Sequence, residues 1–510
     1  MISSLQRRER FRDDYWMKRD PILKDRLLWR AQTFRHTVHL LPGQTILELG
    51  CGKLQFTRAL LQVSRGENRV TAVTFAGDLE AVGVTDSKIE LLQLNELPGA
   101  LRGRHFDCVV AMDMLDRDNA PQLLGLVREL LVPGGEALFY ESNPWNPVQR
   151  LRSLFSTIVG KPDPRKLINR PKLYDLLSEL EFIRVNAVFN DFVFAPLTRT
   201  LIWFLRNLST LLENTPGIQR MAGSILVHGQ KSPQQKEQLK TSLFAHESLR
   251  GAISVVTPCR NEETNLSPLV ERIVDLYGEY LHEIIAVDDS STDRTYEVML
   301  ELAAKYPWVK PLRRTPPNGV GLAITDGLSA ASGRYVLMTD CDFQDLVPEF
   351  RDLLDGIAED YDVVIGSRFS RHSVLLNYPF LKIVANRAFH ALARALFSRD
   401  IRDVTNNLKI MRREVVQDLL LREPGFAVNA ETGLQPILLG YSIKQVPISW
   451  IGRSPEMGVS SFRLLHFGTG YFRVLTGLWL NRIFGIGPYR RLNRTSPSRT
   501  PTQAKNAPFV

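Results

Sequence analysis

The feature that most constrains this chain is an alternation of short apolar runs with longer amphipathic stretches, which occurs in two separate parts of the sequence. This pattern is typical of repeated strand–helix units, in which helices cover a mostly parallel sheet. In the first part, strands are expected at residues 45–50, 69–75, 106–113, 135–142, 182–189 and 224–231. In the second part, they are expected at residues 252–258, 283–290, 334–342, 362–368 and 444–450. The fold class is therefore α/β, with two separate sheets.

The length agrees with two cores, because 510 residues exceed the usual ~100–200 residues of one domain. Residues 231–250 are polar, hold one Pro and lack a strand pattern, which is typical of a linker. The last residues are rich in Pro, Ser, Thr and basic side chains, which predicts a disordered tail. We therefore expect domains at 1–231 and 251–488, a linker at 232–250 and a tail at 489–510.

Composition narrows the protein class. With 44% hydrophobic and 23% charged residues, the chain is an ordinary globular protein. It has no run of 18 apolar residues and no apolar signal segment, so we expect a cytoplasmic protein without a spanning helix. Its four cysteines are far apart, so they are expected to be reduced core residues.

A Gly-rich turn follows the first expected strand, where TILELG leads into Gly50-Cys51-Gly52 and then an amphipathic helix. Glycines there permit positive φ and a close approach of a ligand to the backbone, and the helix start offers free N–H groups. A nucleotide-type site is one interpretation. A tight turn between strand and helix is the other.

The motifs of residues 15–231 occur in the order of the class I S-adenosylmethionine-dependent methyltransferases, which this part of the chain resembles. They are ILELGCG, HFDCVVAMDMLDR, LLGLVRELLVPGGEALFYE and LLENTPGIQRMAGSILVHGQK. The resemblance implies a Rossmann-like methyltransferase fold and a site for S-adenosylmethionine at Glu48, Gly50 and Gly52. Asp78 and Asn95 are the candidates for the ribose and adenine contacts.

Two departures bear on that cofactor. The family's ribose-binding acid at the end of strand two is replaced by Thr74 or Phe75, and Asp78 comes three or four residues late. The acid for adenine is replaced by Gln93 or Asn95. Two alternatives stay open: an active methyltransferase, or a domain that keeps the fold without the cofactor.

Polar side chains and one proline follow two expected strands of the second domain. The carboxyl ends of parallel strands meet at one crevice, so these side chains should face one ligand. They are Pro258, Arg260 and Glu262 after the first strand, and Asp288, Asp289 and Asp293 after the second.

A third group, in RYVLMTDCDFQD, predicts a metal site. Asp340 and Asp342 alternate with Cys341 on an extended segment and should point the same way, with Gln344 continuing that face. Such oxygen ligands suit Mg²⁺ or Mn²⁺ bridging a diphosphate, where the cation neutralises charge on the leaving group. The alternative for an isolated pair of this kind is a capping or solvated strand end.

Together these motifs resemble the GT-A-fold family 2 glycosyltransferases, especially the dolichyl/polyprenyl-phosphate sugar synthases, over residues 251–465. The matching segments are VVTPCRNEETNL, AVDDSSTDRT, NGVGLAITDGLSAASGRYVLMTDCDFQD, DVVIGSR and ETGLQPILLGYSIKQVPISWIGR with GVSSFR. The resemblance implies a nucleoside-diphosphate sugar donor, with Pro258, Glu262 and Asp289 at the base and ribose. It also implies Arg368 and Arg453 at phosphates.

The sequence departs from that family where the acceptor and donor phosphates bind. Val320 and Ser461 stand where the family has lysines, and Thr405-Asn406-Asn407 follows Asp403 in place of Ser-Gly-Phe. Acceptor identity is therefore less constrained than donor class.

The acceptor decides whether a general base is needed. A polyprenyl phosphate is already an anion, so its direct in-line attack would invert the anomeric carbon. A sugar hydroxyl would need a base, for which Glu431 is the candidate, with a role in acceptor positioning or at a helix start as alternatives.

Two amphipathic segments, 375–397 and 462–487, could lie at a membrane interface or pack as ordinary core helices. The net charge of +9 lies in the chain ends, because residues 1–36 hold ten basic and five acidic residues and residues 490–510 hold five basic and none acidic. This distribution gives no support for a nucleic-acid groove. It favours peripheral contact with the cytoplasmic membrane face, at about 1 kcal/mol per basic residue.

The sequence thus predicts a metal-dependent family 2 glycosyltransferase with a polyprenyl-phosphate acceptor and an attached methyltransferase-like domain. One alternative is an enzyme that glycosylates a glycan hydroxyl and methylates that glycan. Another is a methyltransferase-like domain that serves as a non-catalytic scaffold.

Overall fold

The computed structural model divides the chain into two compact units. Unit 1 comprises residues 1–239 and 374–380, and unit 2 comprises residues 240–373 and 381–510. The structure describes residues 2–13, 22–75, 86–94, 99–158, 166–192, 199–233, 242–370, 372–376, 378–398, 400–451 and 464–492.

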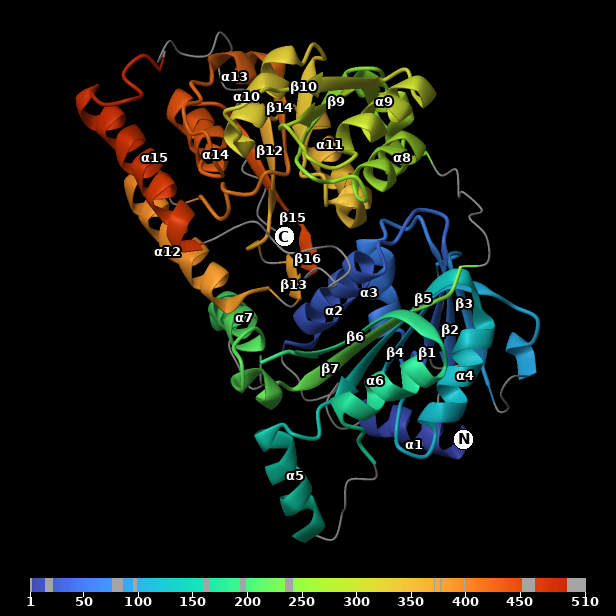
Figure 1. Cartoon of the computed structure of the whole chain (residues 1–510). Coiled ribbons are helices and arrows are strands. Elements are labelled where there is room, and N and C mark those ends of the chain that lie inside the picture. Colours follow the sequence, from blue (N-terminus) through green and yellow to red (C-terminus); the bar gives the residue numbers. More distant parts are fainter. Residues whose placement is uncertain are drawn as a thin grey trace. The chain divides into compact units, whose positions relative to one another are not determined.

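Unit 1 is built on a seven-stranded sheet with the order β3-β2-β1-β4-β5-β7-β6 (Figure 1). Its strands are β1 Thr45–Leu49, β2 Arg69–Thr74, β3 Ile89–Gln93, β4 Phe106–Met112, β5 Leu131–Ser142, β6 Phe182–Asn190 and β7 Ser224–Lys231. All neighbours are parallel except β7, which runs antiparallel to both β5 and β6. The short strand β13, Val374–Leu376, also belongs to this unit.

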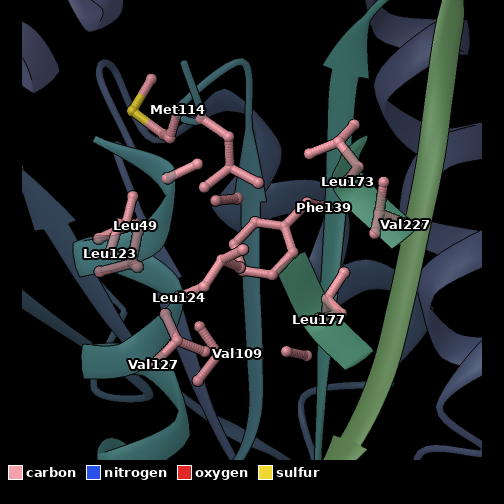
Figure 2. Close-up of a cluster of buried hydrophobic side chains, with 14 of the residues drawn as sticks. Leu49, Val109, Met114, Leu123, Leu124, Val127, Phe139, Leu173, Leu177 and Val227 are labelled. Atoms are coloured by element: carbon pink, nitrogen blue, oxygen red, sulfur yellow. The ribbon is translucent and has the colours of Figure 1, made fainter. Parts of the chain in front are cut away.

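The helices described in unit 1 are α1 Ile2–Phe11, α2 Leu23–Thr37, α3 Gln55–Val63, α4 Ala120–Leu130, α5 Pro147–Ile158, α6 Arg170–Glu179 and α7 Arg199–Glu213. Among them, α4 and α6 place apolar side chains on the sheet. Leu123 and Val127 of α4 and Leu173 and Leu177 of α6 are spaced four residues apart, so each pair lies on one helix face. Figure 2 shows these four side chains around Phe139 of β5, in a core of fully buried residues.

Unit 2 contains a second seven-stranded sheet with the order β10-β9-β8-β11-β14-β12-β15. Its strands are β8 Ile253–Cys259, β9 Leu281–Asp288, β10 Val309–Arg313, β11 Tyr335–Met338, β12 Val363–Ser367, β14 Lys409–Arg412 and β15 Ile443–Pro447, with a short β16 at Ser449–Ile451 outside this sheet. Only β14 is antiparallel to its neighbours, β11 and β12. The amino end of β14 therefore lies at the edge where the other strands have their carboxyl ends.

Eight helices of unit 2 are described: α8 Leu266–Tyr277, α9 Thr295–Lys305, α10 Val320–Ala330, α11 Phe350–Ala358, α12 Phe380–Leu396, α13 Arg413–Asp418, α14 Val428–Leu439 and α15 Leu464–Phe484. Helices α12 and α15 lie side by side (Figure 1). Phe389 contacts Tyr471 edge to face at 5.7 Å, and Arg482 donates to the Leu396 carbonyl at 2.8 Å. Within the described residues, no helix combines the length and the apolar character needed to cross a bilayer.

The expected strands are all present, within a few residues at their ends, and the structure adds β3, β10 and β14 to the two sheets. Strands β3 and β10 are sheet edges with several partly exposed side chains, so they lack a continuous apolar run. Strand β14 has only four residues and begins with Lys409.

Both ends of the second domain differ from the expected bounds. Residues 242–250, assigned to the linker, pack on unit 2: Leu243 is buried and His246 Nε2 lies 2.7 Å from Asp355 Oδ1. Tyr489 and Leu492, assigned to the tail, are buried in the unit 2 core. The expected linker and tail otherwise fall mainly on residues 234–241 and 493–510, outside the described residues.

The basic N-terminal segment does not form a uniformly basic surface. Arg8, Arg12, Arg26 and Arg30 are each at most 9% exposed. Arg26 and Arg30 pair with Asp191, and Arg8 pairs with Glu141. The expectation that this charge faces a membrane is therefore corrected for these four residues, because internal acids neutralise part of it.

Candidate functional site

The candidate site of unit 2 lies at the edge of the sheet where its parallel strands end. Residues that follow β8, β9, β11 and β12 gather there because the carboxyl ends of parallel strands share one edge. The antiparallel β14 brings residues from the opposite chain direction, since its first residue, Lys409, pairs with Met338 and Ile365. Loops before and after strands thus contribute to one site.

The two acids at the carboxyl end of β9, Asp288 and Asp289, are both buried. Asp288 is fully buried, accepts a 3.0 Å hydrogen bond from the Ser291 amide and lies 3.6 Å from the Arg313 guanidinium. Asp289 pairs with Arg314 and accepts a 2.7 Å hydrogen bond from the Gly319 amide. Asp289 therefore joins the β9 turn to the start of α10.

The remaining expected donor residues form a hydrogen-bonded loop pair. Pro258 is partly exposed at the end of β8, and Arg260 is exposed. The Glu262 carboxylate accepts from Asn265 at 2.6 Å, and its amide donates to Thr295 at 2.8 Å.

Asp293 lies at the start of α9 and accepts from the Thr295 amide at 3.0 Å and from the Glu263 amide at 3.3 Å. The contact with the Thr295 amide, two residues on, makes an Asx-type turn before α9. The contact with the Glu263 amide couples the loop after β8 to the loop after β9.

Asp340 and Asp342 follow β11 and are both partly exposed, while Cys341 between them is 3% exposed. The side-chain amide of Asn407 donates to Oδ1 of Asp340 at 2.7 Å. Within the ranges that the structure describes, no group of three or more His, Cys, Asp or Glu is placed to hold a metal ion. Two accessible carboxylates still fit Mg²⁺ or Mn²⁺, because these cations keep water and phosphate oxygens as further ligands.

The side chain of Gln344, the third expected ligand, lies outside the described residues. So does Arg453, which was expected at a phosphate.

Arg368 is held by Asp403 rather than standing alone. Its Nε and Nη2 donate to the two carboxylate oxygens at 2.7 and 3.0 Å, and Nη2 also donates to Thr405 at 3.1 Å. Although burial opposes ionisation, the Arg368 charge and hydrogen bonds lower the pKa of Asp403 far below its usual range. Any phosphate contact of Arg368 would thus be made by a guanidinium that is already positioned.

His390 and Lys409 are fully buried beside this ion pair. Nδ1 of His390 donates to the Asn386 carbonyl at 2.7 Å, and Nε2 accepts from the Val404 amide at 2.9 Å. Burial lowers the pKa of His390 to about 4, so the ring is neutral.

The Lys409 amine donates to the Asn429 carbonyl and to Thr432, each at 2.9 Å. Burial lowers its pKa to about 7, despite the opposing charges of Asp403 and Asp340. Lys409 therefore places a titratable cation behind the acids of the sheet edge.

Glu431, the candidate base, is buried in α14 with both oxygens engaged. It accepts from the Arg422 amide at 3.0 Å, the Glu423 amide at 3.1 Å and the Tyr489 hydroxyl at 2.6 Å. Burial raises its pKa. These contacts fix the loop before α14, and they favour positioning over proton transfer.

That loop packs against the glycines of the NGVG motif. The Gly321 amide donates to the Pro424 carbonyl at 2.9 Å. A Cβ at Gly319 would lie 2.3 Å from that carbonyl oxygen, and one at Gly321 would lie 2.0 Å from the Glu423 oxygen. A chain of contacts thus links Glu431 to the start of α10 and, through Gly319, to Asp289.

In unit 1, the Gly-rich turn lies after β1 as expected, with φ of 74° at Gly50 and 51° at Gly52. Glu48 is buried and accepts from Thr57 at 2.6 Å, and burial raises its pKa to about 7. The Gly52 amide donates to Glu9 of α1. Asp78 and Asn95 lie outside the described residues.

Sequence reasoning missed three residues of the unit 2 site: Arg314, Asn407 and Lys409. Arg314 directly follows β10, an expected place for a ligand residue had that strand been recognised. Lys409 is a lysine within an apolar run, which is itself a signal of a buried, specific role.

Comparison with known proteins places part of unit 2 in the family that its sequence motifs resemble. Residues 254–420 match the family described as glycosyl transferase family 2. Dolichol-phosphate mannosyltransferase of Pyrococcus furiosus is 34% identical over 35% of this chain and 51% of that protein, so the chain spans about half the length of this relative. Dolichyl-phosphate hexose transferase of Haloferax volcanii is 30% identical over 41% of this chain and 87% of that protein.

Among solved structures, glucosyl-3-phosphoglycerate synthase from Mycobacterium tuberculosis matches 46% of this chain and 81% of that chain. The sequence identity is 22% and the TM-score is 0.35.

Proposed function

Because this chain belongs to glycosyl transferase family 2, we propose that unit 2 has a GT-A fold and moves a sugar from a nucleoside diphosphate to a polyprenyl-phosphate-type lipid. The observation that carries this proposal is the gathering of Asp289, Asp340 and Asp342 at one sheet edge, with Asn407 bound to Asp340. The dolichyl-phosphate names of two relatives support the acceptor class.

The donor side would be formed by the loops after β8 and β9. Pro258, Glu262 and Asp289 would contact the base and ribose, with Arg260, Asp288 and Asp293 around them. The mutual hydrogen bonds of Glu262, Asp293 and Thr295 support this, because a preformed loop loses less entropy on binding.

Asp340 and Asp342 would hold Mg²⁺ or Mn²⁺, with Gln344 as a third candidate. When bound, the cation would neutralise charge on the departing diphosphate. Asn407 orients Asp340 through its 2.7 Å hydrogen bond. Arg368 and Arg453 are proposed to face phosphates, with Arg368 held in place by Asp403.

The engagement of Glu431 supports an acceptor that needs no base. Its oxygens accept from two backbone amides and from Tyr489, so proton removal from a hydroxyl would disturb three hydrogen bonds. A phosphate monoester anion can attack the anomeric carbon directly, which would invert its configuration.

The surface of α12 and α15 supports contact with a lipid. Large apolar side chains are exposed on both helices, including Leu381 at 66% and Phe472 at 59%. Other exposed apolar residues on these helices are Val384, Leu392, Ile483 and Phe484. We therefore propose peripheral attachment, at the cytoplasmic face of the membrane.

The test is transfer from radiolabelled UDP- and GDP-sugars to undecaprenyl phosphate with Mn²⁺. Asp342→Ala is expected to lose transfer, whereas Glu297→Ala, an exposed acid on α9, is expected to retain it. Full transfer by Asp342→Ala would sink the metal assignment, and absence of lipid-linked sugar with every donor would sink the acceptor class.

For unit 1 we propose a class I methyltransferase-like fold, supported by the order β3-β2-β1-β4-β5-β7-β6 with β7 antiparallel. Methyl transfer to a glycan would require S-adenosylmethionine at the Gly-rich turn. The residues there do not fit it, because the Gly52 and Phe75 amides already donate to Glu9.

A further inference from the structure

The Gly-rich turn of unit 1 lies where an open parallel sheet offers a ligand crevice. Strand β1 is flanked by β2 on one side and β4 on the other, so the strand order reverses at this point. Such a reversal opens a gap between neighbouring loops at the carboxyl ends of the strands. In this chain, the gap receives side chains from α1 and from the two residues after it, Arg12 and Asp13.

Glu9 takes the backbone donors of the crevice. One carboxylate oxygen accepts from the Gly52 amide at 2.8 Å, and the other accepts from the Phe75 amide, just after β2, at 2.7 Å. Glu9 is only 1% exposed. A carboxylate on two amides of adjacent loops occupies donors that a nucleotide-type ligand would use.

Arg12 takes the backbone acceptors. Its Nη1 donates to the Gly50 carbonyl at 2.6 Å and to the Met112 carbonyl at 3.3 Å, which bridges the ends of β1 and β4. Asp13 accepts from its Nε and Nη2 at 3.0 and 2.8 Å. Arg12 is 1% exposed, so the point of reversal is filled by a neutralised ion pair.

The fit of this pair depends on glycine in the turn. A Cβ at Gly52 would lie 2.1 Å from Oδ2 of Asp13 and 2.8 Å from Nη2 of Arg12. Asp13 and Arg12 therefore occupy the space that a side chain at position 52 would need.

Helix α1 is also anchored along its length. Leu5 is fully buried in the unit 1 core, and Ser4 donates to Asp116 at 2.7 Å. Arg8 donates to the Asp113 carbonyl at 2.8 Å and to Glu141 at 3.1 Å. Several independent contacts therefore hold Glu9 and Arg12 in place.

We propose that α1 and the two residues after it form an internal plug, in which Glu9 and Arg12 replace a ligand in the Gly-rich crevice. The whole chain then binds neither S-adenosylmethionine nor S-adenosylhomocysteine at this turn, and unit 1 is non-catalytic in this state. The proposal concerns unit 1 and does not rest on the glycosyl transfer proposed for unit 2.

The experiment combines calorimetry with hydrogen exchange. Titration of the whole chain with millimolar S-adenosylmethionine or S-adenosylhomocysteine is expected to give no saturable heat. Amide exchange followed by mass spectrometry is expected to show slow exchange at Gly52 and Phe75 in the wild type. Exchange at both sites should be at least tenfold faster in the double variant Glu9→Ala with Arg12→Ala, which we call the plug variant.

Arg7→Ala with Arg10→Ala is the matched control, because both arginines are exposed on the same helix. Its exchange at Gly52 and Phe75 should equal that of the wild type. If the plug variant fails to fold by circular dichroism, Glu9→Gln preserves the volume and replaces it.

Saturable heat in the wild type would overturn the proposal. Fast wild-type exchange at Gly52 and Phe75 would also overturn it, as would equal protection in the wild type and a folded plug variant. Gain of cofactor binding by the plug variant, with none in the wild type, would support it further.

Discussion

The side-chain amide of Asn407 donates a 2.7 Å hydrogen bond to Oδ1 of Asp340, across 67 positions of sequence. It fixes one of the two accessible carboxylates after β11 and reaches that strand from the loop before the antiparallel β14.

Loss of the Asn407 contact should weaken metal binding. Groups that orient a metal ligand typically affect affinity by about 10- to 100-fold. We expect Asn407→Ala to raise the Mn²⁺ concentration for half-maximal transfer by about that factor, with less effect at saturating metal. A metal titration of activity checks this. An unchanged midpoint would show that Asn407 does not orient the ligand.

Burial of Lys409 should leave a signature in the pH dependence of stability. Its pKa is about 7 in the folded chain and near 10.4 in a model peptide, so the unfolded chain binds more protons between these values. The Lys409 contribution to stability should therefore rise with pH across that window. In metal-free buffer, the Tm of the wild type should therefore rise relative to that of Lys409→Met between pH 7 and pH 9.

Lys444→Met is the control for that experiment, because Lys444 lies at the surface and pairs with Glu359. Its Tm difference from the wild type should stay nearly constant. Equal slopes for both variants would contradict a lowered pKa of Lys409 in the folded chain.

Glu431→Gln separates positioning from base catalysis. A glutamine can keep its oxygen on the Arg422 and Glu423 amides and donate to Tyr489, so positioning should survive. We expect transfer within a few-fold of the wild type. If Glu431 were a general base, this change would remove the base and transfer would be lost.

Tyr489→Phe removes one hydrogen bond to the buried Glu431 carboxylate and should lower the free energy of unfolding by about 1–3 kcal/mol. Initial rates and thermal unfolding provide the two readouts.

Gly52→Ala, compared with Gly66→Ala, should reveal the contact between the turn and the residues just after α1. Both glycines have positive φ, at 51° and 69°, so both variants carry a similar backbone cost of about 1 kcal/mol. Only Gly52 would place a Cβ against Asp13, whereas nothing lies within 4 Å of a Cβ at Gly66. We expect Gly52→Ala to have the lower Tm in calorimetry. Its free energy of unfolding should be lower than that of Gly66→Ala by the cost of about 1–3 kcal/mol typical of overpacking. Equal values would argue against a docked Asp13.

Strand positions and the acids at strand ends were predictable because they depend on local patterns. Strands β1, β8 and β9 are rich in apolar residues and mostly buried, and their following turns carry Gly52, Asp289 and the neighbouring polar residues. The topology of parallel sheets then brings these residues to one edge.

The partners of those acids were not predictable, because they come from distant parts of the chain. Asp289 binds Arg314, and Asp340 binds Asn407, in loops whose strands were not recognised. Glu431 was the candidate base, with acceptor positioning or a helix-start acid as alternatives. Its hydrogen bond from Tyr489 was not predictable, because the composition of the C-terminal region assigned Tyr489 to a tail.

Charge counting failed in the same way at the N-terminus. A sum over residues 1–36 does not distinguish an exposed arginine from one bound to a buried acid. Arg8 and Arg12 are both nearly inaccessible, and their partners Glu141 and Gly50 lie far along the sequence.

Unit 1 includes residues 374–380, where the Tyr378 amide donates to Oδ1 of Asn214 at 2.9 Å. These residues leave the ribosome after most strands of the unit 2 sheet, although N-terminal domains generally fold first during synthesis. Unit 1 can therefore reach its final form only late in translation. Unit 1 is not one continuous segment of the chain. Cutting the chain near residue 239 would therefore separate β13 from the rest of its unit.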